Sequence, residues 1–183
     1  MTSFAGLEVR PLESTDRDRL SAAFERLSDA SRSARFHGAK ARLGERELDR
    51  LTRLDHITRD AVIAVERDSG RIVGVARYAT DAGRVSAAEI AIVVADEWQG
   101  RGLGTALTRL LMWRAATTGF TRLSASVQAD NRRAQRLLRR LGFVLRGRDG
   151  DALELAVDLR AGRLPRARPV TPSPSAVGAV AAA

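Results

Sequence analysis

One stretch of the chain, residues 87–117, joins an apolar strand, a glycine-rich turn and an amphipathic helix without a gap. The strand has a period of two, and leucines recur at helical spacing from residue 103 to about Thr117. The two faces of the strand consist of Ile90, Ile92 and Val94, and of Glu89, Ala91 and Val93. One carboxylate, Glu89, therefore lies within an otherwise apolar strand.

The turn reads Gln-Gly-Arg-Gly-Leu-Gly over residues 99–104, directly before the helix. Free backbone N–H groups and the helix dipole favour an anion at such a place, and glycine lets a ligand approach the main chain. The turn lacks the Gly-Lys-Ser/Thr ending of a Walker loop, and its glycine spacing differs from the dinucleotide motif Gly-x-Gly-x-x-Gly. These residues indicate a diphosphate site of another kind.

Gln99, Gly102 and Gly104 match the acyl-CoA-binding motif of the GNAT superfamily of N-acetyltransferases, which the turn resembles. A second signature of that superfamily runs from Asn131 and Ala134 to Gly142-Phe143. The resemblance implies that the CoA diphosphate lies on the turn and that the pantetheine arm pairs with the preceding strand. The residues it assigns to acetyl-CoA are Ile92, Val93, Val94, Gln99, Gly100, Arg101, Gly102, Leu103, Gly104, Thr105, Asn131 and Ala134.

The order of elements predicts an α/β (α+β) protein with the GNAT fold: a mixed, mostly antiparallel sheet of about seven strands, flanked by about four helices. Residues 7–158 form the expected domain, and residues 159–183 form an expected disordered tail rich in Pro, Arg and Ala. Asp16 is the expected cap of the first helix, and the second helix begins near Glu45. The chain between these two helices has loop character.

A narrower resemblance is to the catalytic domain of bacterial Pat-type protein lysine acetyltransferases. It is carried by Ser31-Arg32 to Arg35-Phe36, residues 47–55, Gly74 to Tyr78, and residues 88–104. It implies transfer of acetyl from acetyl-CoA to a protein lysine. A small amine, such as a polyamine, aminoglycoside or amino acid, is the alternative acceptor. A non-catalytic acyl-CoA sensor is the alternative outside the enzyme class.

Glu89 is the candidate general base, because an apolar strand disfavours the charged carboxylate and raises its pKa toward a useful range. The Pat-type resemblance places the catalytic glutamate at the same position. The competing interpretation is an ion pair with Arg77 on a neighbouring strand. Many superfamily members have a tyrosine as general acid where this chain has Leu138. A backbone N–H near Val93 or Val94 is the expected contact for the thioester carbonyl.

Composition narrows the expected partners. The 183 residues carry a net charge of +9 and no cysteine, which argues for one domain in a cytoplasmic setting and against disulfides. With two histidines in unrelated contexts, no metal site is expected. The sequence has neither a signal segment nor an apolar run of membrane-spanning length. Only 4% of residues are aromatic, so nucleic acid is an unlikely partner, and the expected state is a monomer or homodimer.

Overall fold

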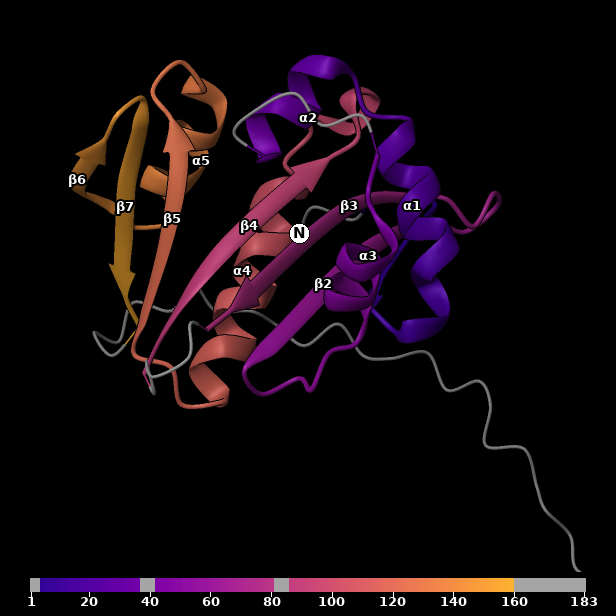
Figure 1. Ribbon diagram of the computed structural model, residues 1–183, viewed down its shortest axis with the longest axis horizontal. Coiled ribbons are helices and arrows are strands. Elements are labelled where there is room, and N and C mark those ends of the chain that lie inside the picture. The colour runs from indigo at the N-terminus through magenta and orange to yellow at the C-terminus, as the bar shows by residue number, and fades with distance from the viewer. Residues whose placement is uncertain (1–3, 37–41, 81–85, 160–183) are drawn as a thin grey trace, which may run out of the picture.

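The computed structural model describes residues 4–36, 42–80 and 86–159. Within these ranges seven strands form one sheet in the order β1-β2-β3-β4-β5-β7-β6 (Figure 1). The strands are β1 Leu7–Pro11, β2 Arg59–Glu66, β3 Ile72–Ala79, β4 Ala87–Val94, β5 Arg122–Gln128, β6 Val144–Asp149 and β7 Ala152–Asp158. The α-helices are α1 Arg17–Glu25, α2 Asp29–Phe36, α3 Glu45–Thr52, α4 Leu103–Thr117 and α5 Arg132–Arg140. No helix in the described ranges is both long and apolar enough to cross a membrane.

The sheet opens between its two central strands. All neighbouring strands are antiparallel except β4 and β5, which run parallel and pair only from Ala87 to Glu89. Beyond Glu89 the two strands diverge toward the end of the molecule where α2 lies (Figure 1). From Ile90 onward, the edge of β4 that faces β5 therefore has no partner strand among the described residues, while its other edge stays paired with β3.

The two faces of the sheet are covered by different helices (Figure 1). Helix α4 packs on one face through Leu103, Leu107 and Leu111, which are completely buried. Gly74 of β3 permits this close approach, because a Cβ there would lie 2.8 Å from Cδ1 of Leu107. Helices α1 and α3 cover the opposite face with a second apolar cluster that includes Leu20, Phe24 and Leu48. The mixed seven-stranded sheet confirms the predicted fold class.

The two helices after the glycine turn agree with the predictions made from the sequence. Helix α4 begins at Leu103 and ends at Thr117, as the leucine spacing predicts. Asn131 is the N-cap of α5, since its side chain accepts a hydrogen bond from the Ala134 N–H at 3.0 Å. Gly142 ends this helix with φ +91°, and the Phe143 N–H donates to the carbonyl oxygen of Leu138, which completes a Schellman motif.

Two local predictions in the N-terminal half are wrong. The chain between the first two predicted helices is not only loop, because residues 29–36 form α2. Asp16 occupies the N-cap position of α1 but makes no cap bond there; its carboxylate instead accepts from Arg10 and from the Glu13 N–H. The predicted turn at residues 81–83 and the predicted tail from residue 160 lie outside the described residues.

Candidate functional site

A groove of about 700 Å³ occupies the opening between β4 and β5. One wall comes from β4 and α2, and the other comes from β5 and α5. The glycine turn before α4 closes one end. The groove brings together most of the residues predicted to bind acetyl-CoA, with Glu89 among the residues that line it. The assigned residues that line it are Ile92, Val93, Val94, Gln99, Gly100, Gly102, Gly104, Thr105, Asn131 and Ala134.

The turn has the backbone that a phosphate cradle requires. Gly100 and Gly102 have φ of +77° and +87°, which is the left-handed region that favours glycine. A Cβ at either position would meet no described atom within 4 Å, so the space above the turn is open. Gly104 differs, because a Cβ there would lie 3.0 Å from Cδ1 of Leu137 on α5. The space beside Gly100 and Gly102 is thus open at the N-terminus of α4, the kind of position that favours an anion.

Gln99 joins the turn to both walls of the groove. Its Nε2 donates to the carbonyl oxygen of Val94 at 3.0 Å, at the end of β4. Its Oε1 accepts from Nη1 of Arg133 on α5 at 2.9 Å. The side chain that begins the acyl-CoA motif therefore connects the two diverging halves of the sheet.

The hydrogen-bond pattern of β4 identifies the backbone groups that face the groove. The Ala95 N–H donates to Val73 of β3 at 2.9 Å. Because N–H groups alternate in direction along an antiparallel strand, those of Ile92 and Val94 point toward the groove and that of Val93 points toward β3. Of the two residues expected to contact the thioester carbonyl, Val94 has the suitable N–H and Val93 does not.

Glu89 lies at the last paired position of β4 and β5, opposite Ala79 on one side and Ser124 on the other. Its side chain is exposed and lines the groove. This exposure corrects the expectation of a carboxylate enclosed by apolar neighbours. Arg77 of β3 is opposite Ala91, two residues farther along β4, so Arg77 and Glu89 share one face of the sheet. Glu89 thus lies where the two strands part and lines the groove there.

Neither of the two positions considered for a side-chain acid supplies one. Leu138, which occupies the family's tyrosine position on α5, is 1% exposed, belongs to the main apolar cluster and also lines the groove. Tyr78 is completely buried, and its hydroxyl group donates to the carbonyl oxygen of Ile57 at 3.3 Å. Burial raises the pKa of Tyr78 above its ordinary value. Neither residue offers a side-chain acid at the site of Glu89.

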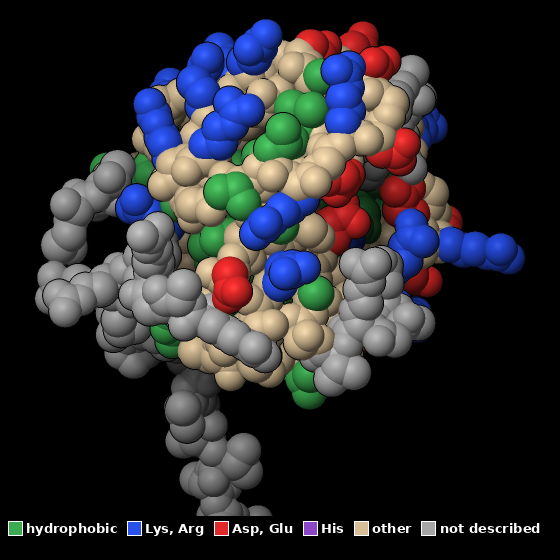
Figure 2. Space-filling view, turned by 90° about the vertical axis from the view of Figure 1, so that its left-hand side faces the viewer, with side chains coloured by type: hydrophobic (Ala, Val, Ile, Leu, Met, Phe, Trp, Pro, Cys, Tyr) green, Lys and Arg blue, Asp and Glu red, His purple; other side chains and the backbone are tan. Residues whose placement is uncertain are grey.

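Arginines dominate the α5 wall and the surface beside it. Three of them line the groove, namely Arg133, Arg136 and Arg140. Figure 2 shows blue side chains gathered over the upper part of the face that α5 and β6 present. The exposed arginines of these elements are Arg132, Arg133, Arg136, Arg139, Arg140, Arg146 and Arg148. The predicted arginine face of the last helix is therefore adjacent to the groove.

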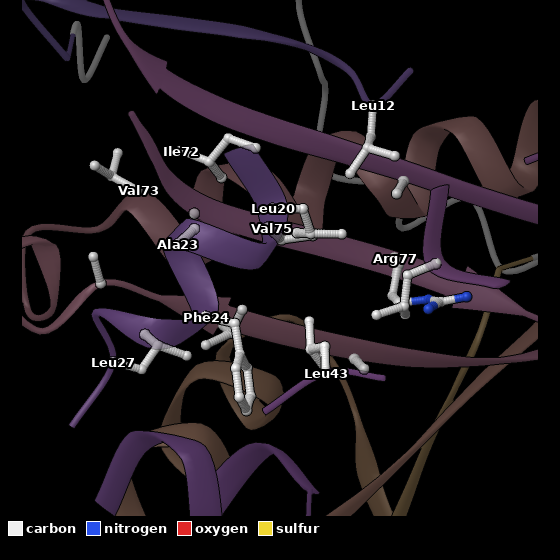
Figure 3. Close-up of a pocket in the computed structure, with 16 residues that line it drawn as sticks. Leu12, Leu20, Ala23, Phe24, Leu27, Leu43, Ile72, Val73, Val75 and Arg77 are labelled. Carbon is white, nitrogen blue, oxygen red and sulfur yellow. The ribbon is translucent and has the colours of Figure 1, made fainter. Parts of the chain in front are cut away.

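A second cavity, of about 60 Å³, lies on the other side of β4 beneath α1 (Figure 3). Its lining is apolar except for Arg77, which lies at one end among the labelled residues. Ala91 and Val93 line both this cavity and the groove. The cavity is a gap in the apolar cluster under α1, whereas the groove carries the polar groups that a phosphate needs.

Two other side chains that stand out in the sequence have structural partners. Trp98 covers the turn; its Nε1 donates to Glu66 at 3.2 Å, and the guanidinium group of Arg101 lies 5.2 Å from the ring centre. Nδ1 of His56 lies 2.7 Å from the carboxylate of buried Asp60, so His56 is not paired with its neighbour in the sequence. Across the described residues, no three acidic, His or Cys side chains form a group that could hold a metal ion.

Comparison with known proteins agrees with this geometry. Residues 24–143 match the model of the acetyltransferase (GNAT) family. The chain belongs to the GNAT family of acetyltransferases. It is therefore an acyltransferase that transfers acetyl from acetyl-CoA.

Among its relatives is acetyltransferase PA5475 of Pseudomonas aeruginosa, 35% identical over 140 residues that cover 74% of each chain. Acetyltransferase Pat of Mycolicibacterium smegmatis is 31% identical over 97 residues, which cover 53% of this chain and 29% of that protein. The GNAT domain of S. lividans Pat superposes with a TM-score of 0.77 at 27% identity, covering 83% of this chain and 90% of that one. These matches confirm the predicted resemblance to the GNAT superfamily and to Pat-type enzymes.

Proposed function

We propose that this GNAT enzyme acetylates lysine side chains of proteins, with Glu89 as the general base. The observation that carries the proposal is the charge of the groove. Of the described residues that line it, three are arginines and two are carboxylates, Glu89 and Asp96. A polyamine or an aminoglycoside carries several positive charges and would favour an acidic groove. An open groove in which arginines outnumber carboxylates lacks that acidic character and better suits one lysine presented by a larger partner.

The resemblance to Pat-type enzymes supports the same acceptor. The two similar Pat proteins are 27% to 31% identical to the chain. The serine- and arginine-containing segment that begins at Ser31 lies within α2, and Ala30, Ser31 and Ala34 of this helix line the groove on the β4 side. An acceptor that approaches Glu89 from the α2 side would meet these residues.

The chemistry requires a deprotonated amine and a polarised carbonyl. Acetyl-CoA supplies the acetyl thioester, which the amine attacks. Glu89, at the parting of β4 and β5, would take the proton from the lysine ammonium, directly or through one water. The N–H of Val94 would donate to the carbonyl oxygen as negative charge develops on it. We infer that the N–H groups of the turn and the start of α4 hold the diphosphate, as the acyl-CoA motif implies.

The leaving thiolate needs no side-chain acid in this proposal. Leu138 is buried at the position where relatives have a tyrosine, and Tyr78 does not line the groove. Water in the groove, or a backbone N–H, would supply the proton instead. Tyr78→Phe and Tyr78→Ala would then change the free energy of unfolding and leave the rate of the chemical step unchanged.

Free thiol release from acetyl-CoA tests the acceptor and the base together. Wild type and Glu89→Gln are each incubated with cell extract separated into protein and small-molecule fractions. Release with the protein fraction, accompanied by labelled acetyl-lysine in digested peptides, is the expected result. Loss of a general base lowers kcat roughly 10²- to 10⁴-fold, so Glu89→Gln should fall within that range.

Glu97→Gln is the matched control, because Glu97 is also exposed and close to the turn but does not line the groove. It should retain wild-type turnover. Release with the small-molecule fraction alone would move the acceptor to a metabolite. Full activity of Glu89→Gln with the protein fraction would show that Glu89 is not the general base. The proposal of a protein lysine as acceptor would be unaffected.

A further inference from the structure

Helix α2 forms part of the groove wall, and its described side chains pack only loosely against the rest of the protein. None of its described side chains, residues 29–34, is buried. Ala30, Ser31 and Ala34 nevertheless line the groove opposite the side formed by α5. An eight-residue helix is too short to be stable alone, so α2 depends on contacts with the rest of the protein.

Those contacts converge on Asp96, which lies in the short 3₁₀ turn directly after β4. Its carboxylate accepts hydrogen bonds from the N–H of Ser28 at 2.9 Å, the hydroxyl of Ser28 at 3.0 Å and the hydroxyl of Ser31 at 2.6 Å. Ser28 immediately precedes α2, and its hydroxyl oxygen accepts from the Ser31 N–H at 3.2 Å. A negative charge at this end of the helix also favours its dipole. Asp96 therefore anchors the N-terminus of α2.

The same anchor is connected to the glycine turn. Nε2 of Gln99 lies 3.0 Å from the hydroxyl oxygen of Ser31 and 3.2 Å from Asp96. On its other side Gln99 accepts the hydrogen bond from Arg133 of α5. A continuous set of hydrogen bonds thus runs from α2 through Asp96 and Gln99 to α5. It passes next to the glycines over which the CoA diphosphate would lie.

We propose that Asp96 is a positioning residue that couples occupation of the acetyl-CoA groove to the placement of α2 on the acceptor side. A diphosphate held by the turn would fix the backbone from Gln99 to Gly104. Since Gln99 and Asp96 are within or next to that segment, fixing it would also fix the residues that hold Ser28 and Ser31. The wall that an acceptor meets would then be fully ordered only after acetyl-CoA has bound.

Hydrogen exchange of the α2 amides, measured with and without saturating CoA, tests this coupling. CoA itself is the probe, so the result does not depend on which amine is acetylated. In the wild type, CoA should slow exchange across residues 29–36 by roughly fivefold, the size of one helix-cap interaction. In Asp96→Asn, CoA should still bind within about threefold of wild type, but the slowing in α2 should disappear. Glu97→Gln, one residue away, should behave as wild type.

Two readouts separate positioning from a merely structural role. Under the proposal, Asp96→Asn lowers kcat several-fold at saturating acetyl-CoA and leaves the KM for acetyl-CoA unchanged. A lower melting temperature together with weaker CoA binding in Asp96→Asn would instead show that Asp96 only supports the fold, and would overturn the proposal. If CoA still slows hydrogen exchange of the α2 amides in Asp96→Asn, CoA protects the helix without Asp96. That result would also overturn the proposal. If Asp96→Asn does not fold, Ser31→Ala removes the contact between α2 and Gln99, and the same loss of CoA-dependent slowing is expected.

Discussion

Helices α4 and α2 both border the groove, α4 at the end closed by the glycine turn and α2 along the β4 wall, and different contacts hold them in place. Helix α4 has 15 residues and packs three completely buried leucines against the sheet. Helix α2 has 8 residues, buries none of its described side chains and is attached by hydrogen bonds to Asp96. Helix α4 is thus held by apolar burial, whereas the described contacts of α2 are mainly polar, with Arg32 also lying over the ring of Phe24 at 6.0 Å.

This difference has a functional consequence for a GNAT enzyme. The turn before α4 must present the same N–H groups to every CoA molecule, and a deeply packed helix keeps them in place. Under the proposed function, the acceptor side at α2 would accept a partner and release it, which suits a helix whose attachment can open locally. The burial of the described residues would then make α4 the more rigid part of the groove and α2 the more adjustable part.

Truncation of the α4 anchor should produce the largest effect. Leu107 is completely buried between α4 and β3, so Leu107→Ala removes packing and leaves a cavity. The expected loss is about 2–5 kcal/mol in the free energy of unfolding, measured by urea denaturation. Leu110→Ala, at a half-buried position of the same helix, should cost less than half as much. Equal losses in the two variants would contradict the view that α4 is held by its buried face.

A smaller effect is expected in the turn itself. Gly102 has φ +87°, so Gly102→Ala strains the backbone by about 1–2 kcal/mol, although its Cβ would meet no described atom within 4 Å. Relief of that strain would shift the N–H groups of the turn, and CoA affinity measured by calorimetry should fall roughly tenfold. Gly44→Ala is the control, because Gly44 has an ordinary φ of −76° and open space around it. An unchanged CoA affinity in Gly102→Ala would show that the turn tolerates other geometries.

The two helices also show which parts of the fold can be predicted from sequence. Helix α4 repeats leucine at helical spacing directly after Gly100 and Gly102, so both its bounds and its role follow from the local pattern. Helix α2 lacks such a pattern, and its segment was expected to be loop. Ser28 and Asp29 are typical helix-start residues, but the bond that makes them effective comes from Asp96, 68 residues away from Ser28. A contact at that separation leaves no local signal.

The environment of Glu89 is a second feature that local sequence does not predict. Glu89 was placed in β4 correctly, yet the alternating strand pattern also suggested an enclosed carboxylate. The strand pairing explains the difference, because β5 leaves β4 immediately after Glu89 and opens the sheet to solvent at that point. Where two neighbouring strands part depends on the register of the whole sheet. The short motif around Glu89 contains no information about it.

The smallest predicted effect concerns the anchor of α2 and its dependence on pH. Burial opposes the charge of Asp96, but hydrogen bonds from Ser31 and Ser28 outweigh it and hold the pKa of Asp96 below its ordinary value of 3.8. For a carboxylate with a lowered pKa, the stabilisation is complete above the unfolded value and disappears as pH falls through the folded one. The Ser28 amide proton, followed by NMR, should therefore keep its chemical shift from neutral pH down to about pH 4 and change only at lower pH. Amides within α4 should show no corresponding step, and Asp96→Asn should abolish it at Ser28. A midpoint above 3.8 for Ser28 would mean that the carboxylate gains nothing from its serine partners, and α2 would then need another anchor.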